Sequence, residues 1–465
     1  MDTVTTPTED HAELAAELAQ RGVKYAMGGW IDVQGRSKSK MVPIDHLPAL
    51  LAGSERYTPR GMGDLGAMTP HEDECVALPD IGTLQVLPWD PRFAWMAADL
   101  SFGGREPFAL CPRSTLKKQL ARAEAMGYTV NLGVETEFYV FRPESVDGPA
   151  PAGRPDGYLQ PMSRSGQLSP TPAYDTESTL DAMPFLDRMA DCMQQLDFGL
   201  FSFDHEGGDA QFEFDFSYAP ALRMADRISL FRVMTRQVAK DCGLLATFMP
   251  KPYTGSWGSG HHFNMSLADL DSGQNLFRDR EDASGLGWSK LTYAFVAGVL
   301  RHARSIAAVA TPTVNSYKRL TSRLAGGEIS WAPQWAAYGD NNRSCMIRLP
   351  RNRPAIENRA VDSAANTYLA TALIVAAGLE GIEQALEPGD PVTSQTYDWT
   401  TPPPGAVRLP RTLLEAVDAF EEDPLVHEVF APQFVTDYVE MKHAEWDAYH
   451  AEVTAWERSR YLLNL

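Results

Sequence analysis

The chain has 465 residues, 44% of them hydrophobic, so it is long enough for one large domain with a smaller companion. Its 61 acidic and 41 basic side chains give a formal net charge of −20, which repels phosphate backbones and anionic lipids. We therefore expect neither a nucleic acid nor a membrane as a partner. The five cysteines include no CxxC pair, which argues against a disulfide framework or a structural zinc site and favours the cytoplasm.

Residues 1–111 are predicted to form a small β-rich domain. The spacing of apolar residues predicts a helix over 11–20, which ends before Gly22, and then strands over 24–33, 85–89 and 93–100. Pro112 begins the next helix, which Gly127 ends. We therefore place a domain boundary after residue 111 and expect a second domain over 112–465.

The second domain alternates strand-like stretches with long amphipathic helices. The expected strands cover 130–141, 198–203, 211–216, 261–267 and 345–349. The expected helices cover 221–242, 289–310, 364–385 and 434–461, and a proline-rich surface loop is expected over 397–410. This order predicts an α+β catalytic domain.

Two groups of acidic residues are candidates for metal binding. Glu135 and Glu137 lie two apart in an apolar strand, so both side chains leave one face, where their charges repel unless a cation lies between them. A tight glycine turn after Glu206 can bring that residue close to Glu213. A solvated strand face and a solvated turn are the simpler alternatives, although the apolar residues around Glu135 favour burial and metal ligation.

A glycine-rich segment over 255–260 precedes a strand whose side chains alternate between two faces. His262, Asn264 and Ser266 would share one face, which makes His262 a candidate ligand. His261 would point the opposite way, and a histidine in that position is more often a hydrogen-bonded structural residue.

Four arginines follow in an otherwise acidic protein: Arg319, Arg343, Arg348 and Arg359. Grouped arginines suggest bidentate recognition of carboxylate and phosphate groups. For any one of them, a salt bridge to a structural acid is an equally good interpretation.

Taken together, these segments resemble the glutamine synthetase family. The motifs GxExEF, HExxxxQFE, TFMPKPxxxxxGSGxH, PTVNSYKRL, NNRSxxIR and IExR follow one another from Gly133 to Arg359, over about half of the chain. Residues 31–36 resemble the start of the family's N-terminal β-grasp domain, and 456–458 resemble its C-terminal helix signature. The resemblance implies a β-grasp domain plus a catalytic domain whose curved antiparallel sheet is flanked by helices. It also implies a homo-oligomer with active sites between subunits, commonly a double hexameric ring.

The resemblance implies a site that binds two to three Mg²⁺ ions, with Mn²⁺ as a possible substitute, and ATP as co-substrate. The ligands on the glutamate side would be Glu137, Glu206 and Glu213, and those on the nucleotide side Glu135, His262 and Glu357. Glutamate would be held by Arg319, Arg359 and Gly258, and the ATP phosphates by Arg348, Asn264 and Ser266. The catalytic groups would be Arg343, which faces the transferring phosphoryl group, with Arg319 and Glu137. ATP would convert the γ-carboxylate of glutamate to a γ-glutamyl phosphate, which an amine then attacks.

Three departures from the family pattern affect the amine site. The family's Asp-Gly-Ser-Ser segment is replaced by residues 60–65, and Trp331 falls where a flap glutamate is expected, unless a local shift puts Glu328 there. Trp257 replaces an asparagine that contacts the substrate amino group. The pocket therefore resembles that of the type III branch, the glutamate-methylamine ligases and γ-glutamyl-alkylamide synthetases, with Tyr174 as one possible wall.

Two other functions are compatible with the same motifs. One is a glutamine synthetase that uses ammonia, with Asp64 or Glu328 in place of the missing acids. The other is a catalytically inactive structural or sensing member of the superfamily, which the intact set of ligand positions argues against. Tyr397 falls near the family's adenylylation loop, and we expect an exposed, unmodified loop residue there.

Overall fold

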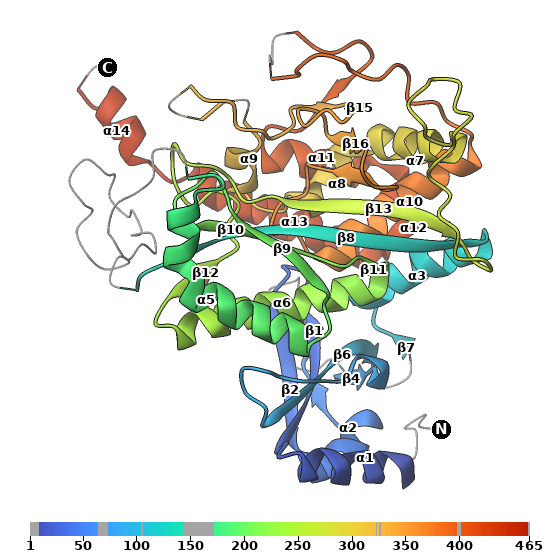
Figure 1. The fold of residues 1–465 in the computed structure, drawn as a ribbon, viewed down its shortest axis with the longest axis vertical. Helices are drawn as coiled ribbons and strands as arrows, with labels where there is room; N and C mark the ends of the chain where they lie inside the picture. The colour runs from blue at the N-terminus through green and yellow to red at the C-terminus, as the bar shows by residue number, and fades with distance from the viewer. Residues whose placement is uncertain are drawn as a thin grey trace.

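The computed structural model describes residues 9–63, 73–103, 106–143, 172–321, 323–324, 327–397 and 401–463. These residues form two main sheets, a small one near the N-terminus and a larger one that carries most of the helices (Figure 1). None of the described helices is both long enough and apolar enough to cross a membrane.

The small sheet has the strand order β2-β1-β6-β4-β3, with β5 and β7 paired to β6. Its strands are β1 (Tyr25–Ile31), β2 (Ser37–Pro43), β3 (Arg56–Tyr57), β4 (Cys75–Pro79), β5 (Gln85–Val86), β6 (Phe93–Phe102) and β7 (Glu106–Pro107). β1 pairs antiparallel with β2 and parallel with β6. Helices α1 (Glu9–Gln20) and α2 (Leu47–Leu51) bury Leu18 and Leu50 in the core cluster that also holds Met96 of β6.

The large sheet has the strand order β15-β16-β17-β13-β8-β10-β9, with β11 and β12 paired to β8. Its strands are β8 (Tyr128–Phe141), β9 (Leu200–His205), β10 (Gln211–Phe216), β11 (Ala219–Pro220), β12 (Leu245–Thr247), β13 (His261–Asp269), β15 (Tyr338–Asp340), β16 (Ile347–Leu349) and β17 (Ile356–Asn358). The pairs are antiparallel except β15 with β16. A separate two-stranded ribbon joins β14 (Trp335–Ala336) to β18 (Val407–Arg408). The expected α+β class with a mainly antiparallel catalytic sheet is confirmed.

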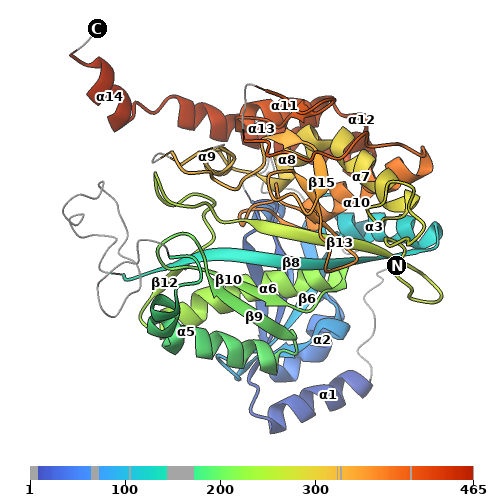
Figure 2. The same cartoon turned by 45° about the horizontal axis from the view of Figure 1, so that its top comes forward.

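Helices surround the large sheet, as Figures 1 and 2 show. They are α3 (Pro112–Ala125), α5 (Thr176–Gln195), α6 (Ala221–Asp241), α7 (Lys290–Arg301), α8 (Ala303–Ala310), α9 (Ser316–Arg319), α10 (Thr367–Glu383), α11 (Leu413–Glu422), α12 (Pro424–Val429), α13 (Pro432–His450) and α14 (Ala455–Tyr461). α10 is apolar nearly all round because it is buried on most sides. α7 packs closely on it, since a Cβ at Gly298 would lie 2.0 Å from the carbonyl oxygen of Ala377.

Two expected helices are interrupted. The segment 289–310 forms α7 and α8 with a break at His302, whose imidazole contacts Asp423 at 2.7 Å and Glu380 at 2.5 Å. The segment 434–461 forms α13 and α14, and α14 extends away from the body of the molecule (Figure 2). Apolar spacing continues across both breaks, so it does not reveal them.

A buried arginine ties the small sheet to the helices of the large one. Arg113 at the start of α3 contacts Asp80 at 2.7 Å and Asp99 at 2.9 Å beside the small sheet, and Asp226 of α6 at 3.0 Å. Its side chain is only 4% exposed, and the contact with Asp226, which is 6% exposed, is shielded from water. The division at residue 111 remains a prediction.

Candidate active site

Strand register brings the predicted acidic residues to one face of the large sheet. Glu135 and Glu137 of β8 are two residues apart, so their side chains leave the same face. His262 of β13 lies directly opposite Glu135, and Glu213 of β10 lies directly opposite Glu137. Three neighbouring strands therefore place four ionisable side chains together.

The same face continues across β17 and β16. Glu357 lies opposite Asn264 of β13, and Arg348 lies opposite Glu357. A cavity of about 540 Å³ opens over this face. Its walls include Glu135, Glu137, Glu206, Glu213, His262, Gly258, Tyr174, Trp331, Arg319, Arg343, Arg348 and Arg359.

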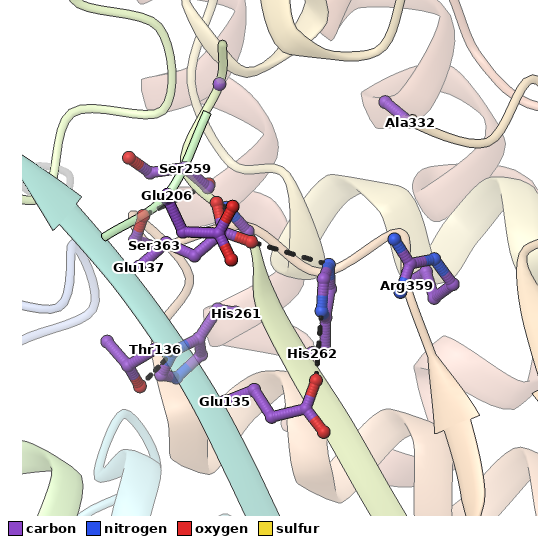
Figure 3. A network of polar contacts seen from close by, with 12 residues as sticks. Glu135, Thr136, Glu137, Glu206, Ser259, His261, His262, Ala332, Arg359 and Ser363 are labelled. Carbon is purple, nitrogen blue, oxygen red and sulfur yellow. Dashed lines mark hydrogen bonds and ion pairs between the residues drawn. The ribbon is translucent and has the colours of Figure 1, made fainter. Parts of the chain in front are cut away.

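His262 stands between two sets of carboxylates, as Figure 3 shows. Its Nδ1 lies 3.3 Å from Glu135 Oε2 and 4.0 Å from Glu357 Oε1, and its Nε2 lies 3.8 Å from Glu137 Oε1. Two groups of possible ligand atoms result, each within 4.8 Å: Glu135, His262 and Glu357 in one, and Glu137, Glu213 and His262 in the other. A neutral imidazole offers one lone pair and one N–H, so it can ligate a metal on one side and donate a hydrogen bond on the other.

Burial shifts the charges of this cluster in opposite directions. It lowers the pKa of His262 well below the usual value, and Arg359 nearby adds to the effect, so the ring is neutral and available as a ligand. Burial also raises the pKa of Glu137 and of Glu213, helped by the negative charge of Glu206. Burial acts to raise the pKa of Glu357 too, but ion pairs led by Arg359 outweigh it and hold the value below normal.

These residues fit divalent metal ions. Carboxylate oxygens with one imidazole suit Mg²⁺ and Mn²⁺, and a cation between Glu137 and Glu213 would stabilise the charged form of both carboxylates against the effect of burial. A buried acceptor also lacks a protein partner: Asn264 Nδ2 donates to Glu135 at 3.0 Å, while Asn264 Oδ1 has no hydrogen bond among the described residues. This oxygen is a further possible contact for a bound ligand.

The predicted arginines differ in how firmly they are held. Arg319 is buried and donates to the carbonyl oxygens of Ala360 and Arg359, both at 3.1 Å. Arg348 and Arg359 both contact Glu357, Arg348 at 2.8 Å. Arg343 is exposed at the cavity wall, so its guanidinium is accessible to a ligand.

Three aromatic residues line the cavity: Tyr174, Trp257 and Trp331. Trp257 lies against the backbone of Gly207, where a Cβ would be 2.8 Å from three atoms of the indole. Tyr174 and Trp331 have positive φ angles of 61° and 59° and are 69% and 46% exposed. Non-glycine residues rarely adopt this conformation, so the turns hold both rings at the site against a local cost.

The structure places most of the predicted site residues together, with three exceptions. Glu206 lines the cavity, but it is absent from both groups of close ligand atoms in the described part of the chain. Asn264 and Ser266 lie on the same strand as His262 and do not line the cavity. His261 points to the opposite side of β13, where its Nδ1 lies 2.9 Å from Thr136 Oγ1 (Figure 3).

Some residues of the site were not expected from the sequence. Arg353 donates to Glu135 at 2.8 Å and to Glu357 at 2.7 Å from a loop that no periodic pattern covers. Asp215 of β10 also lines the cavity, and burial together with the charges of Glu135 and Asp204 raises its pKa to about 7. Its position two residues after Glu213 was a signal for the shared face.

The alternative flap and loop residues are also placed. Trp331 lines the cavity, whereas Glu328 is exposed and does not. Asp64 lies outside the described residues. The expectation that Tyr397 is exposed is wrong: it is 8% exposed, and burial raises its pKa to about 12.

Comparisons with known proteins agree with this geometry. The family model described as glutamine synthetase, catalytic domain, matches residues 109–461. The glutamate–methylamine ligase of Methyloversatilis universalis is 36% identical over 452 residues, which cover 96% of this chain and 97% of that protein. A glutamine synthetase of Rhizobium leguminosarum bv. phaseoli is 34% identical, over 97% of this chain and 99% of that protein.

Two solved structures are similar along nearly the whole chain. A GmaS complex with ADP superposes with a TM-score of 0.85 at 34% identity, covering 97% of this chain and 99% of that chain. GmaS without ligand superposes with a TM-score of 0.84 at the same identity. Since the catalytic-domain model and these relatives match most of the sequence as well as the fold, the chain belongs to the glutamine synthetase family.

Proposed function

We propose that this protein is an ATP-dependent carbon–nitrogen ligase that joins a small primary amine, such as methylamine, to the γ-carboxylate of glutamate. The observation that supports it most directly is the cavity, whose lining combines the aromatic residues Tyr174, Trp257 and Trp331 with a cluster of carboxylates and arginines. The charged part suits phosphoryl transfer to a carboxylate, and the aromatic part suits an acceptor that carries carbon.

The charged residues divide into two proposed metal sites. The nucleotide-side ligands would be Glu135, His262 and Glu357, which form one of the close groups. The glutamate-side ligands would be Glu137 and Glu213, with Glu206 completing the set if its carboxylate turns toward them. Two to three Mg²⁺ or Mn²⁺ ions in the whole active site would neutralise the phosphate and carboxylate charges that must meet.

The arginines would bind and orient the anionic substrates. Arg319, fixed by two backbone carbonyls, and Arg359 would hold the carboxylates of glutamate, with Gly258 giving the substrate close access to the backbone. Arg343 would face the phosphoryl group during transfer, and Arg348 with Asn264 would contact the ATP phosphates. Asn264 and Ser266 do not line the cavity, so both would meet the nucleotide only farther along β13.

The chemistry then proceeds in two balanced steps. The γ-carboxylate attacks the terminal phosphorus of ATP, which releases ADP and leaves a γ-glutamyl phosphate. The amine nitrogen attacks the acyl carbon, phosphate leaves, and the nitrogen loses a proton to give an N-substituted glutamine. Positioning and charge neutralisation supply most of the catalysis in phosphoryl transfer, which agrees with a site made of fixed arginines and carboxylates.

We further propose a homo-oligomer, with a double hexameric ring as the specific form, and active sites between subunits. The exposed C-terminal segment supports association, because Trp456 in the first turn of the projecting α14 is 61% exposed and Leu463, just after this helix, is 94% exposed (Figure 2). Large apolar side chains grouped in this way favour contact with another protein surface. Sedimentation would give the stoichiometry.

The acceptor is tested by steady-state kinetics with methylamine and ammonia at equal concentrations of the unprotonated form. We expect a higher kcat/KM for methylamine in the wild type. Trp331→Ala should reduce this preference by about fourfold, the effect of one CH₂ group worth roughly 0.8 kcal/mol. If ammonia is the better acceptor and Glu328→Gln abolishes its use, the protein is instead a glutamine synthetase, an activity that the Rhizobium relative supports.

A further inference from the structure

Arg353 contacts both carboxylates of the nucleotide-side group through one atom. It lies in the loop between β16 and β17, and its Nη2 is 2.8 Å from Glu135 Oε1 and 2.7 Å from Glu357 Oε2. Its Nε is buried without a hydrogen-bond partner in the described part of the chain. The two carboxylates are therefore the contacts that fix this guanidinium.

The oxygens that Arg353 uses differ from those that approach His262. Nδ1 of His262 lies 3.3 Å from Glu135 Oε2 and 4.0 Å from Glu357 Oε1, the second oxygen of each carboxylate. One oxygen of each glutamate is thus held by the guanidinium, and the other lies on the side of the imidazole, where Glu357 Oε1 also accepts from Arg359 Nη1. Such an outer contact fixes the rotation of a carboxylate and so orients the oxygen that is left for an ion.

We propose that Arg353 is a positioning residue for the nucleotide-side metal ion. The inference rests on the proposed ligand set of Glu135, His262 and Glu357. Without a cation at Nη2, the two glutamates would repel each other and their inner oxygens would lose their common direction.

The effect should fall mainly on Glu135. Glu357 has two further cationic partners, Arg348 and Arg359. Glu135 has Asn264 and the neutral ring of His262 as its other polar contacts in the described residues. Arg353 is therefore the main cation in contact with the Glu135 carboxylate.

The positive charge of Arg353 has a second effect on metal binding, opposite in sign to its effect through orientation. A guanidinium is positively charged and repels a divalent cation, so its removal would tighten metal binding if simple charge repulsion prevailed. Orientation and repulsion thus predict changes of opposite sign in metal affinity.

The chain offers a matched control two residues away. Arg351 belongs to the same loop and pairs with Asp340 at 2.5 Å, with its side chain 74% exposed. Replacing Arg351 by methionine removes the same charge from the same loop but leaves Glu135 and Glu357 untouched.

Calorimetric titration of the metal-free full chain with Mn²⁺, without nucleotide, would compare wild type, Arg353→Met, Arg353→Lys and Arg351→Met. We expect Arg353→Met to weaken one class of Mn²⁺ site by about tenfold or more and to leave the glutamate-side class unchanged. Arg353→Lys, which keeps a cation, should restore part of the loss, and Arg351→Met should match wild type. Unchanged or tighter binding in Arg353→Met overturns the proposal.

The titration also separates this inference from the proposed function. Glu357→Gln, introduced alone, should remove the class of Mn²⁺ site that Arg353→Met weakens. If it does not, the metal assignment and the role of Arg353 both fail. Neither measurement uses an amine, so the identity of the acceptor does not affect it. Thermal unfolding confirms that each variant is folded, and Arg353→Gln replaces the methionine variant if that one is not.

Discussion

Gly260 has no room for a side chain, because three residues of the proposed site occupy the volume that its Cβ would need. A Cβ there would lie 2.6 Å from His262 Nε2, and 2.9 Å from both Glu137 Oε1 and Arg319 Nη2. The backbone of Gly260 also pairs with Glu137, which accepts from its N–H at 2.9 Å through Oε2. A single added methyl group would therefore press on a metal ligand, a carboxylate and a substrate-binding arginine together.

We expect Gly260→Ala to fold but to lose most of its activity. The backbone angle φ of Gly260 is not positive, so alanine imposes no left-handed strain. Ordinary contacts between heavy atoms lie at about 3.5–4.0 Å, so the three side chains must withdraw by roughly 1 Å. A displacement of about 1 Å in a catalytic site costs on the order of 10²-fold in rate, while overpacking costs about 1–3 kcal/mol of stability.

The assay is kcat/KM with the preferred amine, together with Mn²⁺ affinity and the midpoint of thermal unfolding. Ser259→Ala is the matched control, because Ser259 is fully buried next to Gly260 and its hydroxyl has no partner among the described residues. It should retain wild-type kinetics. If Gly260→Ala keeps more than about a tenth of the wild-type kcat/KM, the three side chains do not need the positions that they occupy.

Two further predictions follow from charged groups. Arg319→Ala should raise the KM for glutamate by about tenfold or more with less effect on the KM for ATP, since it removes a carboxylate contact; the opposite pattern would assign Arg319 to the nucleotide. Burial acts to lower the pKa of His302, but hydrogen bonds to Asp423 and Glu380 outweigh this effect and raise the pKa. Arg301, 3.9 Å from Glu380, is a positive charge near the same group. The stabilisation by protonated His302 is therefore full below the ordinary pKa of about 6.5 and is lost as pH rises through the higher pKa of the folded state. Urea unfolding should show a smaller loss of stability between pH 6 and pH 9 in His302→Gln than in wild type, and an equal loss would contradict this assignment.

Alternation of side chains along strands predicted the shared face of Glu135 and Glu137 and the direction of His262, while the other members of the charged site were implied by the family resemblance. His262 and His261 were assigned to opposite faces from their positions alone, and the structure places them so. The tight turn predicted only that Glu206 and Glu213 come close. The grouping of Glu213 with Glu137 was implied by the family resemblance, and their register became visible only in the sheet. Period-two patterns carry this information because each residue in a strand has a fixed face.

Residues outside regular elements could not be predicted in this way. Arg353 lies in a loop whose path depends on its own ion pairs, and no periodicity assigns it a direction. The break at His302 comes from contacts with residues far along the chain, which a local apolar pattern does not contain. Tyr397 is buried for the same reason: its surroundings come from segments that are distant in sequence.

Overall similarity does not determine the acceptor, because a methylamine ligase at 36% identity and a glutamine synthetase at 34% are almost equally similar to this chain. The proposed metal ligands and arginines would serve the activation of glutamate, a step that both reactions need. On this proposal the acceptor is selected where the aromatic residues of the cavity lining meet the carboxylates. Trp257 lies flat against Gly207, and Trp331 is kept at a positive φ of 59°. The strained backbone costs stability, and an exposed ring offsets this cost only when a ligand covers it. An alkylamine brings a methyl group that the ring can contact, whereas ammonia does not.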